Sequence, residues 1–160
     1  MTELDSYVES LNGGFGFMDG VSTRLNSQIG WPPKWRAEIR RSIRGLADLS
    51  DDWDSYKAGP VSAQSIEIAC RVLDQAIDEN PGLQYHLPNK PTVTAAPGFP
   101  FSNVQLEWDS ADGNRSLDVE FLSNGTLSFG LTDARDPSVC CDGVADHWAE
   151  IISVLGESAL

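Results

Sequence analysis

The spacing of hydrophobic residues changes along this chain and divides it into a helical part and a sheet part. Between residues 31 and 80, apolar residues recur every three or four positions, as they do on one face of an amphipathic helix. From about residue 93 to residue 131 they recur at every second position, which is typical of strands with one buried face. The pattern therefore predicts helices followed by an antiparallel sheet.

Three helices are predicted. The first begins at Pro32-Pro33, because a helix tolerates proline in its first turn, and its apolar stripe comprises Trp35, Ile39, Ile43 and Leu46. The second begins after the N-cap residue Ser62 and ends at Asn80-Pro81-Gly82; its stripe comprises Ile66, Ala69, Cys70, Leu73, Ala76 and Ile77. The C-terminal helix is predicted from Val144, Trp148, Ile151, Ile152 and Leu155.

The strands are predicted from three clear runs of alternation. Their apolar residues are Val104, Leu106 and Trp108, then Leu117, Val119 and Phe121, then Leu127, Phe129 and Leu131. Val93 and Ala95 suggest one more strand, and Asn124-Gly125 is a strong signal for a tight hairpin. Residues 133–143 are expected to form a loop. The predicted fold is α+β: two amphipathic helices, then a three- to four-stranded antiparallel meander, then a C-terminal helix.

The first thirty residues differ in character from the rest. Phe15 and Phe17 alternate with glycines there, which favours a flexible, aromatic-bearing contact loop over a phosphate-binding loop, since neither a preceding strand nor a Gly-Lys-Ser/Thr sequence is present. We therefore expect a Gly/aromatic segment over 1–30 and one α+β domain over 31–160. No basic and then apolar leader opens the sequence, so a cytoplasmic protein without a membrane span is expected.

Charge is the most unusual bulk property. The formal net charge is −13 and the sequence pI is about 4.3. Residues 34–44 hold five of the eleven basic residues and one of the 24 acids, so the remaining chain is more acidic still. An acidic surface repels phosphate, which disfavours direct nucleic-acid binding and suits a basic protein partner. Excess acid also keeps a protein soluble without any partner.

The basic segment carries an alternative hypothesis. Arg36, Arg40 and Arg44 are spaced by four and line one helix face. This face is either a recognition surface for nucleic acid or another phosphate ligand, or a solvated face that answers the acidic remainder of the fold.

A second alternative is a small metal-dependent hydrolase. Asp51, Asp52 and Asp54 could ligate a hard cation, but Trp53 stands among them and the EF-hand pattern is missing. We instead expect Trp53 and Tyr56 to fill the core while the aspartates face water or cap a helix.

The remaining polar residues do not assemble a catalytic set. Glu107, Asp118 and Glu120 lie on the wet face of the predicted sheet, where carboxylates are ordinarily solvated. Neither histidine has an identifiable nucleophile beside it, and the three cysteines lack zinc-ligand spacing. The sequence thus predicts a protein that is not an enzyme, with no metal and no cofactor.

The order of motifs resembles a known group of small bacterial and phage proteins. The residues that carry it are Trp53-Asp54-x-Tyr56-x-Ala58-x-Pro60, a helix, Pro91-x-Val93, and Val104-Gln105-Leu106-Glu107-Trp108 before a hairpin. That group typically reads Gly-Trp-Asp-Gly-Tyr-Gly-Ala and later Val-x-Leu-Glu-Trp. The resemblance covers residues 50–131 and implies a helix-then-meander order, a bacterial or phage source, and no assigned catalytic residue or cofactor. The glycines are replaced here by Asp52, Ser55 and Lys57, so a different turn is expected.

Together these features favour a non-enzymatic interaction factor of the inhibitor, antitoxin or counter-defence type. Its acidic surface would bind a basic protein partner. The sequence is also compatible with a homo-oligomer. The candidate partner-binding residues are Phe15, Phe17, Asp51, Asp52, Asp54, Glu107, Asp118 and Glu120.

Overall fold

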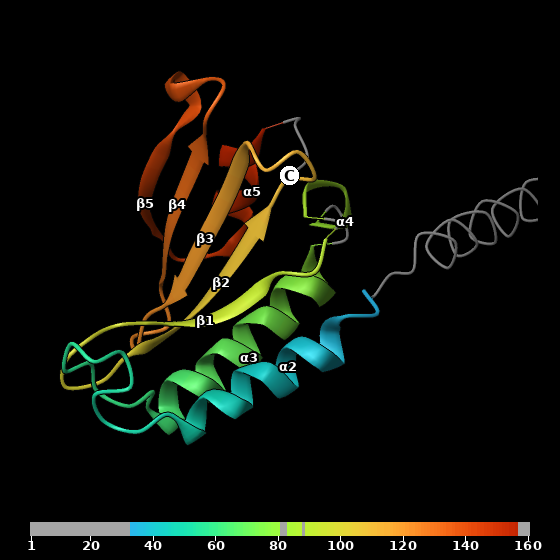
Figure 1. Cartoon of the computed structure of the whole chain (residues 1–160). Helices are drawn as coiled ribbons and strands as arrows, with labels where there is room; N and C mark the ends of the chain where they lie inside the picture. The colour runs from blue at the N-terminus through green and yellow to red at the C-terminus, as the bar shows by residue number, and fades with distance from the viewer. Residues whose placement is uncertain (1–32, 81–82, 88, 157–160) are drawn as a thin grey trace, which may run out of the picture. The chain divides into compact units, whose positions relative to one another are not determined.

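The computed structural model describes residues 33–80, 83–87 and 89–156, and its described fold belongs to one compact unit, Trp35–Leu160 (Figure 1). The helices are α2 (Arg36–Gly45), α3 (Ala63–Glu79), α4 (Leu83–His86) and α5 (Trp148–Leu155), with 3₁₀ turns η1 (Leu46–Asp48) and η2 (Pro137–Val139). The strands are β1 (Thr92–Ala96), β2 (Asn103–Asp109), β3 (Arg115–Phe121), β4 (Leu127–Asp133) and β5 (Cys141–Ala145). The fold is α+β. Phe15 and Phe17 lie outside the described residues.

The sheet has five antiparallel strands in the order β1-β2-β3-β4-β5. The predicted count of three to four strands is therefore too low. β5 lies mostly where a loop was predicted, because backbone hydrogen bonds to β4 hold this edge strand without a run of alternating apolar residues. Gly143 lies under the ring of Phe129, and a Cβ at this glycine would be 3.1 Å from that ring.

Two helix boundaries differ from the prediction. α2 begins at Arg36, because Pro33, Lys34 and Trp35 form a turn before it. Val144, predicted on the C-terminal helix, lies on β5 with 66% of its surface exposed. By contrast, the predicted start of α3 is confirmed, since the Ser62 hydroxyl accepts a hydrogen bond from the Ser65 N–H at 3.0 Å.

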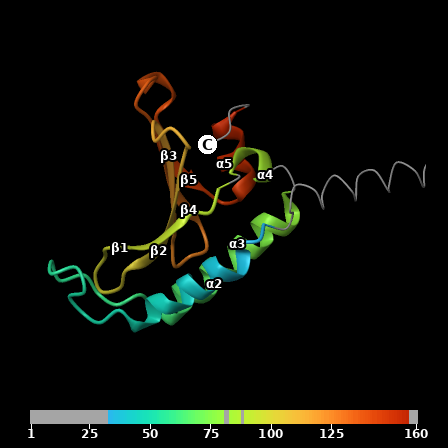
Figure 2. The same cartoon turned by 45° about the vertical axis from the view of Figure 1, so that its right-hand side comes forward.

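The helices gather on one side of the sheet, which buries the inward-facing side chains (Figure 2). The predicted buried face is confirmed at all of its positions, which are Val104, Leu106, Trp108, Leu117, Val119, Phe121, Leu127 and Phe129. Trp148 of α5 packs edge-on against Trp108, with 5.7 Å between ring centroids, and lies beside Phe121. None of the described helices covers the opposite face of the sheet. Among the described helices, none has the length and apolar character needed to cross a bilayer.

Candidate functional site

The uncovered side of the sheet, called the open face below, is acidic. Side chains alternate between the two faces of a strand, so the pairing register fixes which residues lie on it. The outward acids are Glu107, Asp109, Asp118, Glu120 and Asp142. Across the five strands, no outward position holds a lysine or an arginine. The open face therefore presents one sign of charge.

The structure brings the three predicted sheet carboxylates together. Glu107 lies directly opposite Asp118 in the register, and Glu120 follows two residues later on the same strand. Gly130 leaves room for the Asp118 carboxylate, since a Cβ there would be 2.8 Å from Oδ1. Burial raises the pKa of Asp118, and the charge of Glu120 raises it further. Like charges directly opposite each other are destabilising, so the pairing of Glu107 with Asp118 lowers the stability of this face.

Three of the four arginines of α2 form ion pairs with acids of α3. Arg36 pairs with Asp74 at 3.0 Å and Asp78 at 2.9 Å. Arg40 also pairs with Asp74, at 3.2 Å. Arg44 pairs with Glu67 at 2.8 Å, and this hydrogen bond is the main cause of the raised pKa of Arg44.

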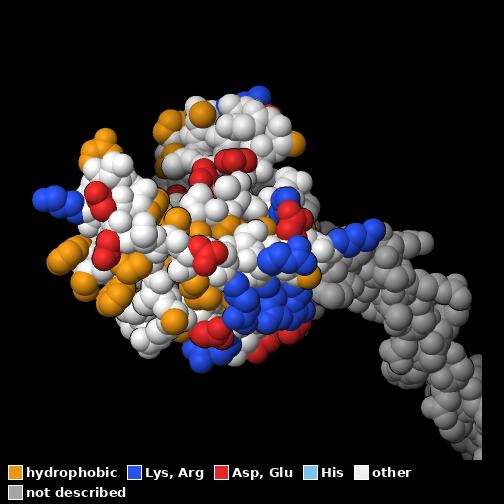
Figure 3. Space-filling model, turned by 60° about the horizontal axis from the view of Figure 1, so that its bottom comes forward, with side chains coloured by type: hydrophobic (Ala, Val, Ile, Leu, Met, Phe, Trp, Pro, Cys, Tyr) orange, Lys and Arg blue, Asp and Glu red, His pale blue; other side chains and the backbone are white. Residues whose placement is uncertain are grey.

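Figure 3 shows several lysine and arginine side chains gathered in one patch with acids beside it, while other basic side chains lie apart. A phosphate ligand on this face would have to compete with carboxylates already in place.

Two aspartates of the loop over residues 51–59 accept hydrogen bonds from backbone N–H groups of the same loop. Asp52 Oδ1 accepts a hydrogen bond from the Lys57 N–H at 2.7 Å. Asp54 Oδ1 accepts from Tyr56 and Ala58 at 2.9 and 3.0 Å. Asp51 is exposed. In the part of the chain that the structure describes, no group of three histidine, cysteine, aspartate or glutamate residues is placed to hold a metal ion.

The backbone of this loop retains the conformation that glycine favours. Asp52, Ser55 and Lys57 have φ angles of 61°, 62° and 69°. These are the three positions at which the motif that the chain resembles has glycine. The expected difference from the turn of that group stays a prediction. The chain takes the left-handed conformation here without glycine, at a cost of about 1–2 kcal/mol per residue.

Ser102 joins this loop to the loop over residues 97–102 between β1 and β2. Its hydroxyl donates to the Gly59 carbonyl at 2.6 Å and accepts from the Trp53 Nε1–H at 3.2 Å and from the Gly98 N–H at 3.3 Å. Trp53 Nε1 also donates to the Gly59 carbonyl, at 3.0 Å. The two backbones touch, since a Cβ on Gly59 would be 1.7 Å from the Pro100 carbonyl oxygen. We call this arrangement the Ser102 junction.

Tyr56 was predicted to fill the core. This prediction is wrong, because Tyr56 is 88% exposed. Trp53 is drawn inward because its N–H finds buried partners, whereas the left-handed residues on either side of Tyr56 turn that ring to solvent. Phe99 is equally exposed at 88%, and Phe101 is 56% exposed. Neither phenylalanine was among the residues predicted from the sequence to bind a partner. The signal was Gly98-Phe99-Pro100-Phe101, which separates aromatics by turn-forming residues as the Phe15–Phe17 segment does.

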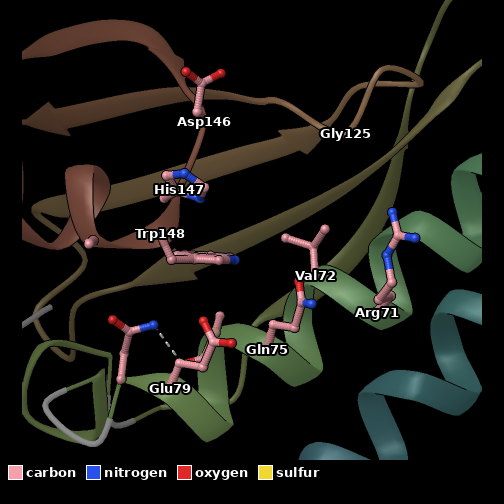
Figure 4. A pocket seen from close by; sticks show the side chains of 11 residues that line it. Arg71, Val72, Gln75, Glu79, Gly125, Asp146, His147 and Trp148 are labelled. Carbon is pink, nitrogen blue, oxygen red and sulfur yellow. Dashed lines mark hydrogen bonds between the residues drawn. The ribbon is translucent and has the colours of Figure 1, made fainter.

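A cleft of about 540 Å³ lies between α3 and the start of α5 (Figure 4). Its walls include Arg71, Gln75 and Glu79 on one side and His147 and Trp148 on the other. His147 precedes α5 and does not lie within it. Glu150 fixes this boundary, because its carboxylate accepts hydrogen bonds from the two backbone N–H groups before the helix, at 2.7 and 3.1 Å. Among the described residues that line the cleft, none is a serine, a threonine or a cysteine.

Comparison with protein-family models, with curated proteins and with solved structures finds no match to this chain.

Proposed function

We propose that the chain is a non-enzymatic interaction factor whose open face binds a basic protein partner. The observation that supports this most directly is the distribution of charge on the sheet. Five carboxylates occupy outward positions of the strands, and no lysine or arginine interrupts them. Burial is the main cause of the raised pKa of Asp118, and the charge of Glu120 adds to it. A cationic partner would offset the repulsion between these acids.

The proposed class is an inhibitor, an antitoxin or a counter-defence factor of bacterial or phage origin that acts in the cytoplasm. Factors of this kind work by covering a surface of their target, and they need no catalytic residue of their own. The net charge of −13 would speed encounter with a basic target through long-range attraction. Partner capture by such a surface weakens as salt screens the charges.

The test compares two variants of equal charge. The open-face variant carries Glu107→Gln, Asp118→Asn and Glu120→Gln. The control variant carries Asp48→Asn, Glu79→Gln and Asp146→Asn, three exposed acids that lie off the outward strand positions. Each variant removes three negative charges, so any difference between them reports on position and not on net charge.

Tagged wild-type protein and both variants are used to capture proteins from host lysate, with washes at low and then high salt. We expect one stoichiometric basic protein on wild-type and control protein, released by salt and missing from the open-face variant. Equal capture by all three proteins, or capture that survives high salt, would contradict the proposal.

A further inference from the structure

Three large aromatic side chains are exposed at one end of the fold. Tyr56, Phe99 and Phe101 come from the two loops that the Ser102 junction connects, and we call them the aromatic tip. Figures 1 and 2 both place the two loops at the same end of the domain, and Figure 3 shows hydrophobic side chains gathered around acids on one lobe. An exposed cluster of large apolar side chains on a soluble protein marks a contact surface.

The tip is held rigidly before any partner arrives. The Ser102 hydroxyl serves three hydrogen bonds and is fully buried, and the Gly59 N–H donates to the Gly98 carbonyl at 2.8 Å. Asp52 and Asp54 fix the backbone on either side of Tyr56. Ordered aromatics lose little conformational entropy on binding, and aromatic residues are enriched at the centres of protein interfaces. The arrangement suits an anchor that inserts into a partner.

Charge decides which kind of partner fits. The tip is bordered by Asp51, Asp52 and Asp54 against one base, Lys57. A membrane surface with anionic lipids would be repelled by this acid excess. A symmetric contact with a second copy would place the same aspartates against one another. A basic protein surface is favoured on both counts.

The tip also adjoins the open face. Asn103 follows Ser102 directly and begins β2, and its side-chain amide donates to the Glu120 carboxylate at 2.8 Å. One partner can therefore contact the acids of the sheet and the aromatics of the tip together.

We infer that the aromatic tip is the apolar anchor for the basic partner of the open face, and that this partner presents lysine or arginine next to an apolar segment. This inference rests on the proposed function and adds to it the chemistry of the recognised segment. Electrostatic attraction then sets the rate of encounter, and burial of Tyr56, Phe99 and Phe101 sets the lifetime of the complex.

The test uses a library of random peptides about 12 residues long, displayed on phage and selected on the full chain. The most enriched peptide is synthesised, and its Kd is measured by fluorescence anisotropy for four proteins. These are the wild type, the tip variant Tyr56→Ser/Phe99→Ser/Phe101→Ser, the open-face variant, and the control Val154→Ser, which removes an exposed apolar side chain from α5, away from the open face. Thermal unfolding checks that the variants fold, as expected for substitutions at exposed side chains.

We expect enriched peptides that combine lysine or arginine with leucine, isoleucine or an aromatic residue. Their Kd should rise at least about tenfold in the tip variant and also in the open-face variant, and should not change in Val154→Ser. Loss in the open-face variant alone would overturn the role of the tip and leave the proposed function standing. Loss in the tip variant alone would overturn the shared partner.

If no peptide is enriched, both the anchor role of the aromatic tip and the binding of a basic partner by the open face are contradicted. Two further measurements address the rival occupants. Sedimentation of a wild-type dimer that the tip variant does not form would replace the basic partner with a second copy. Co-sedimentation of wild type, but not of the tip variant, with phosphatidylcholine vesicles would replace it with a lipid surface.

Discussion

Replacing Ser102 with alanine should destabilise the fold more than the loss of an exposed serine hydroxyl group does. The Ser102 side chain is fully buried, and its oxygen is a hydrogen-bond partner of three groups from both loops. Alanine keeps the shape of the site and removes only the oxygen. The effect therefore measures the hydrogen bonds and not packing.

The magnitude follows from what each partner keeps. The Gly59 carbonyl still accepts from Trp53 Nε1 at 3.0 Å, so that acceptor stays satisfied. The Gly98 N–H loses its acceptor, since its bond to the Ser102 hydroxyl is the one that the structure shows for it. A fully buried donor left without a partner costs about 1–3 kcal/mol. Because the Gly98 N–H is half-buried, we expect Ser102→Ala to lower the free energy of unfolding by about 1–2 kcal/mol.

Urea denaturation at neutral pH measures this change as a shift of the midpoint at constant m-value. The matched control is Ser128→Ala, which removes a serine hydroxyl from the open face on β4. We expect that control to stay within about 0.5 kcal/mol of wild type, as surface substitutions do.

A double-mutant cycle with Trp53→Phe tests whether the junction acts as a unit. Because Trp53 and Ser102 share the Gly59 carbonyl, their effects should differ from additivity by about 0.5–3 kcal/mol. Additive effects, or a loss for Ser102→Ala no larger than that of Ser128→Ala, would refute the reasoning about the junction.

Three further predictions concern the core, the loop and the open face. Phe121→Ala should cost about 3–5 kcal/mol in urea denaturation because Phe121 is fully buried, whereas Tyr56→Ala should stay within about 0.5 kcal/mol; similar losses would contradict the assignment of core and surface. Ser55→Gly and Lys57→Gly should each stabilise the protein by about 0.5–1 kcal/mol, because relief of the left-handed strain exceeds the added entropy of the unfolded chain; a lower Tm in either variant would count against the strain. Asp118→Asn should stabilise the protein most at neutral pH. Burial raises the pKa of Asp118 in the folded state above its ordinary value of 3.8, so the wild type loses stability as pH rises from about 3.8 through the raised pKa. A stability difference between variant and wild type that does not change between pH 4 and 7 would exclude this coupling of Asp118 ionisation to folding.

The spacing of apolar residues predicted the helices and strands correctly where the local pattern agrees with burial in the folded protein. α3 follows from its stripe and its serine cap, and the alternation in β2, β3 and β4 identifies the buried face. β5 was missed because Cys141-Asp142-Gly143-Val144-Ala145 has no strong alternation and owes its place to the exposed edge of β4. An edge strand of this kind is determined by its neighbour and not by its own composition.

The candidate sites were predictable to different degrees. Alternation alone places Glu107 and Asp118 on the outward side of the sheet, but their direct opposition depends on the hairpin register. The pairing of Arg36 with Asp74 joins residues 38 positions apart, which helical periodicity cannot show. The aromatic tip depends on Ser102 meeting Gly59 across 43 positions, so exposure of Tyr56 could not be read from its own loop.

The strand order has a consequence for how the chain folds. Every strand pairs with its nearest neighbour in the sequence, and the connections are short, over residues 97–102, 110–114, 122–126 and 134–140. Closing short loops costs little entropy, so each hairpin can form without waiting for a distant segment. The long-range step is the docking of α2 and α3 onto the finished sheet, which places the slow search of folding on the helices and not on the strands.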